Sequence, residues 1–190
     1  MRTRVLFLLP SLILTSLPAL AVKISGVEIP DTLTLANCGP ELVLNGAGVR
    51  KKLFFDIYIG ALYLPAKSGD ARAILASPAP ASIVMHFLYK KVSRKKITDA
   101  WTDGLADNLS AAEMQALRPR LKKFNALFRT MRKDGTIRLN YLPGKGTEVW
   151  INGEHRGTVR GEDFFHALLG IWLGAHPVSD SLKQHMLGLD

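Results

Sequence analysis

The stretch of sequence that decides the fold, residues 45–64, reads NGAGVRKKLFFDIYIGALYL. It opens on turn chemistry, because Asn45-Gly46 and a second glycine, Gly48, adopt positive φ values at little cost. The residues that follow are rich in aromatic and β-branched side chains, which favours a β-strand. The sequence therefore predicts a glycine-rich turn that leads into one long strand ending at Pro65.

The two faces of this predicted strand differ in chemistry, since side chains alternate between faces along a strand. The even face includes Phe54, Asp56 and Tyr58, and Arg50 shares this parity. A cation, a carboxylate and a phenol above an apolar floor suit a pocket for an acidic, apolar small molecule. A central strand buried on both sides, with Arg50 and Asp56 simply paired, fits the same pattern. The odd face is nearly all apolar: Leu53, Phe55, Ile57, Ile59, Ala61 and Tyr63.

The N-terminal residues have the features of a secretory signal peptide. Two arginines precede an apolar run from Val5 to Leu17, and Ala19-Leu20-Ala21 is a small-residue cleavage site. We expect cleavage after Ala21 and a periplasmic or secreted mature chain of residues 22–190. The apolar run is shorter than the roughly 20 residues that usually span a bilayer, and an uncleaved anchor is the alternative.

Composition narrows the functional classes. Residues 22–190 are enough for a single domain with a substantial core, and we find no internal repeat or interdomain linker. The formal net charge of +9 favours acidic partners such as carboxylates or anionic lipid headgroups, whereas an export signal disfavours nucleic acid. Cys38 is the only cysteine, so the sequence contains no disulfide framework and no Cys-rich metal site.

The remaining pattern predicts an α+β fold. Residues 22–35 read as a hairpin or two edge strands, residues 37–40 as a turn, and residues 81–89 as a central strand. Expected helix N-caps are Asp70, Ser93, Ser110 and Ser179, with a capping box at the third. We expect helices over residues 70–76, 93–108, 110–131, 164–173 and 180–187, and later strands over 136–142, 147–151 and 154–159.

Two of these segments have a second interpretation. Residues 90–96 hold five Lys or Arg side chains, which form either a solvated loop and first helical turn or a surface for an anionic membrane. The helix over residues 164–173 is apolar almost all round, so it is either buried or one wall of a cavity. The helix over residues 93–108 has a narrower apolar stripe, formed by Ile97, Trp101 and Leu105.

No complete catalytic or metal-binding motif stands out in the sequence. The five histidines form neither an H-x-x-x-H nor an HExxH pair, and no serine lies in a G-x-S-x-G context. The glycines at 46 and 48 are not followed by a predicted helix, as a dinucleotide-binding loop requires. We therefore expect no metal ion and no cofactor.

Three segments resemble the chalcone isomerase-like superfamily, and together they cover most of residues 22–190. They are the stretch Gly46–Leu64, the segment Lys96-Ile97-Thr98-Asp99, and the C-terminal run from Gly161 to Gln184. The resemblance implies an open-faced antiparallel β-sandwich with helices packed on the large sheet.

Chalcone isomerases close a flavanone ring, and the resemblance carries their five polar site positions to Arg50, Tyr58, Ser93, Ala100 and Ala167. Only the arginine is retained at these positions, so the acid–base groups are missing and efficient cyclisation is not expected. The family's fatty-acid-binding branch is more similar, because there an arginine and a strand tyrosine hold the acyl carboxylate. Arg50 and Tyr58 match that pair in type and approximate place.

The sequence thus predicts an exported, non-enzymatic binding protein for fatty-acid-like carboxylates, anchored by Arg50 and Tyr58. Asp56 complicates this site, because a neighbouring carboxylate could occupy Arg50 and repel the ligand. One alternative is an isomerase or lyase that acts on a phenolic substrate through Arg50 and Tyr58. Another is an envelope structural or partner-binding protein whose cavity is filled by its own side chains. The other expected lining residues are Phe54, Ser93, Ala100, Ala167 and Leu168.

Overall fold

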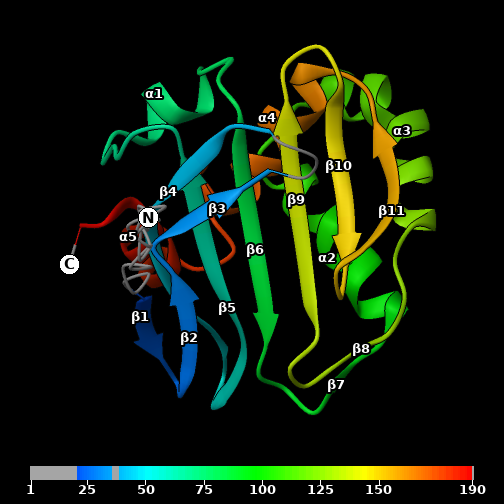
Figure 1. Ribbon diagram of the computed structural model, residues 1–190. Helices are drawn as coiled ribbons and strands as arrows, with labels where there is room; N and C mark the ends of the chain where they lie inside the picture. The colour runs from blue at the N-terminus through cyan, green and yellow to red at the C-terminus, as the bar shows by residue number, and fades with distance from the viewer. Residues whose placement is uncertain (1–20, 36–38, 190) are drawn as a thin grey trace, which may run out of the picture.

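A computed structural model describes residues 21–35 and 39–189 of the chain (Figure 1). The predicted signal peptide lies outside the described residues except for Ala21, and so do Asn37 and Cys38 of the predicted turn. Within the described ranges, no helix combines the length and the hydrophobicity needed to cross a bilayer.

A seven-stranded antiparallel sheet forms the centre of the fold, with the strand order β11-β10-β9-β6-β5-β4-β3. Two short hairpins lie beside it, and the predicted N-terminal hairpin is the first of them. The sheet strands are β3 (Thr32–Thr34), β4 (Glu41–Lys52), β5 (Phe55–Leu64), β6 (Ala81–Phe87), β9 (Thr136–Leu142), β10 (Gly146–Ile151) and β11 (Glu154–Val159). The hairpins pair β1 (Ala21–Ile24) with β2 (Val27–Pro30), and β7 (Lys91–Val92) with β8 (Met131–Arg132).

Helices pack on the face of the large sheet that lies away from the viewer in Figure 1. The four predicted N-caps are confirmed, and Ser110 forms the predicted capping box with Glu113. The predicted α+β architecture, with helices on one face of a large antiparallel sheet, is therefore confirmed. The helices are α1 (Ala71–Leu75), α2 (Arg94–Ala106), α3 (Ala111–Ala126), α4 (Glu162–Leu173) and α5 (Asp180–Leu187).

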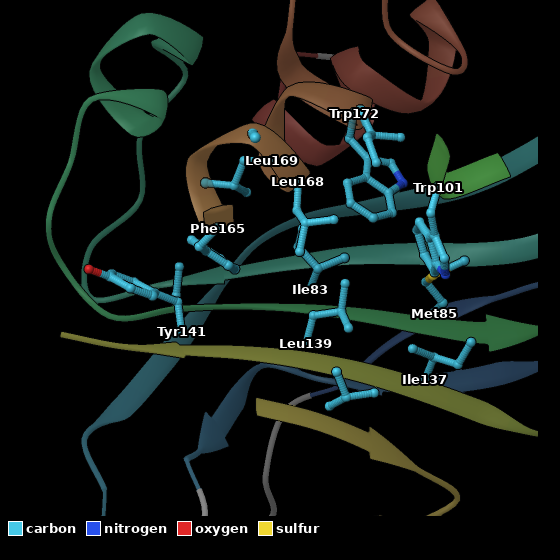
Figure 2. Close-up of a cluster of buried hydrophobic side chains, with 14 of the residues drawn as sticks. Ile83, Met85, Trp101, Ile137, Leu139, Tyr141, Phe165, Leu168, Leu169 and Trp172 are labelled. Carbon is cyan, nitrogen blue, oxygen red and sulfur yellow. The ribbon is translucent and has the colours of Figure 1, made fainter. Parts of the chain in front are cut away.

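The two faces of the sheet carry separate hydrophobic clusters, so β5 is buried on both sides. On the helix side, residues of β6 and β9 such as Ile83 and Leu139 face Leu168 and its neighbours on α4 (Figure 2). On the other side, Ile59, Ala61 and Tyr63 of β5 pack with residues of the N-terminal strands. Apolar side chains therefore fill the space on both faces of β5, the strand that carries Tyr58.

The glycine-rich segment is a strand, so the predicted turn at residues 45–48 is wrong. Strand β4 runs without a break through Gly46 and Gly48, and α5 packs directly across it. A Cβ on Gly46 would overlap the carbonyl oxygen of His185, and one on Gly48 would lie 2.6 Å from the His185 Cβ. These glycines therefore allow the close approach of a helix, which is a second common role of glycine in strands.

The chain instead reverses after Lys52, where Leu53 adopts a φ of +56°. This turn divides the predicted long strand into β4 and β5. Leu53 and Phe55, which the alternation placed on a buried apolar face, are 83% and 53% exposed. The third helix also ends earlier than predicted, at Ala126, because residues 131–132 pair with β7 as β8.

Candidate ligand-binding site

Arg50 and Tyr58 lie directly opposite each other on β4 and β5. A bulge follows Arg50, between it and Lys51, so the side chain of Arg50 keeps its register with Tyr58. The guanidinium carbon lies 5.7 Å from the centroid of the Tyr58 ring. The two side chains therefore share one face, as predicted, but they do so as cross-strand neighbours on β4 and β5 and not by alternation along a single strand.

The Tyr58 hydroxyl belongs to a buried polar pair. The Trp172 indole Nε1 donates a hydrogen bond of 2.9 Å to this hydroxyl. Because the hydroxyl oxygen is the acceptor, its own proton can be donated to another group. Burial raises the pKa of Tyr58, against the smaller opposing effects of the Arg50 charge and the Trp172 hydrogen bond. Tyr58 is thus a neutral hydrogen-bond donor at physiological pH.

Arg50 contributes the second donor. Its Nε atom is buried, and among the described residues it has no hydrogen-bond partner. A buried donor without an acceptor costs free energy, and for a charged group an anionic acceptor offsets that cost most fully. The Arg50–Tyr58 pair therefore offers a charged and a neutral donor to a carboxylate.

Asp56 does not bind Arg50, so the expected competition between this carboxylate and a ligand is absent. The bulge after Arg50 pairs Asp56 with Lys51, whereas an unbroken register would pair it with Lys52. The Asp56 Oδ1 and Lys51 Nζ atoms are 3.4 Å apart; the Lys51 side chain is exposed and that of Asp56 is partly buried. The pairing of Asp56 with Lys51 therefore leaves the guanidinium of Arg50 free of this carboxylate.

Three other residues that were predicted to line the site lie away from Arg50 and Tyr58. Phe54 is 98% exposed at the β4–β5 turn. The Ser93 hydroxyl accepts a hydrogen bond from the Lys96 backbone N–H and caps α2. Ala100 is exposed on the outer side of α2. The structure does not bring these side chains together around Tyr58.

Ala167 and Leu168 lie on α4, and both are buried. Leu168 is one turn before Trp172 and shares its side of the helix, so this face of α4 forms the wall above the sheet (Figure 2). Ala167 lines a hollow of about 530 Å³ between α1, α3 and α4. Neither Arg50 nor Tyr58 lines this hollow.

Sequence reasoning missed the roles of two tryptophans. Trp172 orients the Tyr58 hydroxyl, and Trp101 of α2 lies beside it with the ring centroids 5.8 Å apart. The Trp101 Nε1 atom is also buried without a hydrogen-bond partner among the described residues. The predicted apolar stripe of Ile97, Trp101 and Leu105 is buried, as expected. The family resemblance pointed to Ala100, which is exposed, whereas the neighbouring residue Trp101 faces the core.

We find no candidate metal-binding site in the part of the chain that the structure describes. No group of three or more His, Cys, Asp or Glu side chains there is arranged to hold a metal ion. The polar groups that converge on the helix side of β4 and β5 are hydrogen-bond donors, which suit an anion.

These features define a class of protein in which helices cover one face of an antiparallel sheet. An Arg–Tyr pair on two neighbouring strands lies on the face that the helices cover. A model of the chalcone isomerase-like family matches residues 21–188, so the chain belongs to this family, as the sequence predicted. A search of curated proteins gave no match.

The solved structure of a fatty-acid-binding protein from Arabidopsis thaliana is similar to this chain, with a TM-score of 0.71. The alignment covers 88% of this chain and 96% of that one, at 17% sequence identity. A similarity at this level of identity shows a shared fold.

Proposed function

We propose that this protein binds fatty-acid-like carboxylates without transforming them. The observation that carries the proposal is the buried Nε of Arg50, which has no partner among the described residues and lies across from Tyr58, whose hydroxyl oxygen already accepts from Trp172. A carboxylate between the two side chains would accept a charge-assisted bond from Arg50 and a neutral one from Tyr58. The similar fold of a fatty-acid-binding protein supports this class of ligand.

Binding of the acyl chain requires the interior to open. Tyr58, Leu168 and Trp172 are all buried within the helix-side cluster, so an acyl chain must displace apolar side chains that now fill this space. Trp172 is the natural reporter of that movement, because it contacts the proposed headgroup site and its fluorescence depends on its surroundings. We expect added fatty acid to change the emission of the protein.

The location of the protein is part of the proposal. The basic, apolar and small-residue segments of residues 1–21 support export with cleavage after Ala21. We propose that the mature chain acts in the periplasm or outside the cell. Mass spectrometry of the protein recovered from the periplasm would test this by giving its first residue, which we expect to be Val22.

The decisive experiment is native mass spectrometry, with solvent extraction, on the chain of residues 22–190. We expect acyl carboxylates bound to the wild type and lost from Arg50→Ala. Arg50→Lys should retain part of the binding, since lysine keeps the charge but not the planar fork of donors. Arg72→Ala, on the exposed surface of α1, is the matched control and should bind as the wild type does. Equal binding by Arg50→Ala and Arg72→Ala would rule out the assigned anchor.

The filled interior supports a second candidate, a structural or partner-binding protein of the cell envelope. In that case the wild type would be recovered empty and would not take up added fatty acid. An isomerase acting through Tyr58 has less support, because the raised pKa of the phenol makes it a poor base at neutral pH.

A further inference from the structure

The turn between β4 and β5 exposes three consecutive apolar side chains. Leu53, Phe54 and Phe55 are 83%, 98% and 53% exposed, and they are three of the five large apolar side chains exposed among the described residues. We call residues 53–55 the apolar tip. An aromatic side chain exposed almost completely at the end of a hairpin is unfavourable in water and suits contact with another apolar phase.

Lysines surround the apolar tip. Lys51 and Lys52 precede it on β4, and both are exposed. The segment after β6 lies against the start of β5, since the backbone N–H groups of Leu88 and Tyr89 both donate to the Ile57 carbonyl oxygen. Lys90 and Lys91 follow directly and are exposed. The β4–β5 turn and the β7–β8 hairpin therefore lie at the same end of the molecule, the lower end in Figure 1.

Most of the net positive charge of the protein lies in one segment, residues 90–133, which runs from β7 through α2 and α3 to β8. It holds twelve Lys or Arg and four Asp or Glu residues, a net charge of +8 out of +9 for the whole chain. The remaining residues are nearly neutral, with thirteen cations and twelve acids. Near the tip, Asp56 is close to Lys51 and Asp134 is close to His86.

We propose that this end of the protein docks on an anionic membrane, with the apolar tip in the interface and the surrounding lysines on lipid headgroups. Insertion of apolar side chains combined with attraction of lysines to anionic lipid is sufficient for reversible binding. A folded protein partner suits the surface less well, because three apolar side chains are few for a stable protein interface of about 800 Å² per partner.

The docking does not depend on the proposed acyl site, but the two share one hairpin. Arg50 and Tyr58 lie on the same two strands whose turn carries Phe54. Docking through the tip therefore brings the Arg50–Tyr58 face to the bilayer surface, which is where fatty-acid-like molecules reside. A protein that binds vesicles but no free fatty acid would support docking and contradict the carboxylate proposal, so the two outcomes are separable.

Flotation with lipid vesicles tests the docking, using residues 22–190 so that the apolar leader makes no contribution. This chain retains every described element apart from the first residue of β1. We expect binding to vesicles of phosphatidylglycerol mixed with phosphatidylcholine, none to phosphatidylcholine alone, and release by high salt. Phe54→Ser should weaken binding at least about tenfold. Leu189→Ser removes an apolar side chain that is 51% exposed elsewhere and should have no effect.

A pair of charge reversals tests the orientation. Lys91→Glu lies at the proposed docking end, and we expect it to weaken vesicle binding about fivefold or more. Lys145→Glu lies in the exposed β9–β10 turn at the opposite end of the sheet in Figure 1 and should bind as the wild type does. Equal loss in the two variants would show that only net charge matters and would overturn the orientation.

Phe54→Trp provides a direct reporter at the tip. We expect its added fluorescence to shift to the blue with phosphatidylglycerol vesicles and to be quenched by lipids brominated near the headgroup. Leu189→Trp should show neither change. Absence of vesicle binding at low salt, or binding in which Phe54→Ser equals the wild type, would overturn the proposal. The first of these results would leave the apolar tip as a contact for a protein partner.

Discussion

At the scale of single residues, the contact between Trp172 and Tyr58 couples the candidate site to the packing of the core. Tyr58→Phe removes the acceptor of the Trp172 Nε1 hydrogen bond and leaves a buried donor unpaired. We expect a loss of about 1–3 kcal/mol in unfolding free energy, together with weaker fatty-acid binding. Denaturant unfolding and acyl uptake would measure the two effects.

A double-mutant cycle separates the hydrogen bond from the lost volume. Trp172→Phe removes the donor, so the further cost of Tyr58→Phe should be smaller in the Trp172→Phe background than in the wild type. Additive free energies would show that the bond itself contributes nothing to stability.

Tyr63 lies on the other face of β5, and its ionisation should make the free energy of unfolding depend on pH in alkaline solution. Its hydroxyl donates a hydrogen bond of 2.9 Å to the Pro30 carbonyl oxygen. Burial, with a smaller effect of Asp31, raises the pKa of Tyr63 from 10.0 to about 12. The unfolded chain therefore loses this proton at lower pH than the folded one does. The contribution of Tyr63 to the free energy of unfolding is therefore fully present below pH 10. It should be lost as the pH rises from 10 to about 12.

Measurement of the unfolding free energy across that range checks the prediction. Tyr63→Phe lacks the ionisable group, so the decrease should be shallower in this variant. Part of the decrease should persist, because Tyr58 also has a raised pKa. An unchanged slope in Tyr63→Phe would contradict the assignment.

At the scale of elements, the packing of α5 across β4 depends on glycine. A Cβ on Gly48 would lie 2.6 Å from the Cβ of His185, closer than two packed carbons allow. We expect Gly48→Ala to displace α5 and to cost about 1–3 kcal/mol of stability. Thermal unfolding and hydrogen exchange of residues 180–187 would detect the change.

Gly170 is the matched control for this substitution. It lies within α4, and the nearest atom to an added Cβ would be 3.8 Å away, at the Cβ of Asn108. Alanine also favours a helix interior over glycine by about 1 kcal/mol. Gly170→Ala should therefore be neutral or stabilising, and destabilisation of both variants to the same extent would show that general loss of glycine, not the α5 contact, is responsible.

At the scale of the whole molecule, two hydrophobic clusters share the same sheet. Leu168 belongs to the helix-side cluster and Leu42 to the other, and both are fully buried. Because β5 contributes side chains to both clusters, we expect one cooperative unfolding transition. Leu168→Ala and Leu42→Ala should each lower its midpoint, with a cost of about 2–5 kcal/mol.

Two spectroscopic signals test this cooperativity. Trp101 and Trp172 both lie in the helix-side cluster, so tryptophan fluorescence mainly follows that side. Far-ultraviolet circular dichroism follows the whole chain, including the sheet. The two transitions should coincide in the wild type and in both variants, and separate midpoints would show that the two sides unfold independently.

Much of the fold could be predicted from the sequence because the relevant signals are local. The Ser110 capping box and the stripe of Ile97, Trp101 and Leu105 lie within one or a few helical turns. The segments that resemble the family also predicted the fold class. These properties depend on neighbours in the chain, so the order of residues was sufficient to determine them.

The tertiary structure alone decided the features that depend on contacts between distant segments. Gly46 and Gly48 had the chemistry of a turn, but the approach of α5, more than 130 residues away, makes them part of a strand. A bulge after Arg50 turned Asp56 toward Lys51, and Trp172 reached Tyr58 across 114 positions of the chain. Such contacts are set by the packing of helices on the sheet, and local sequence does not contain that information.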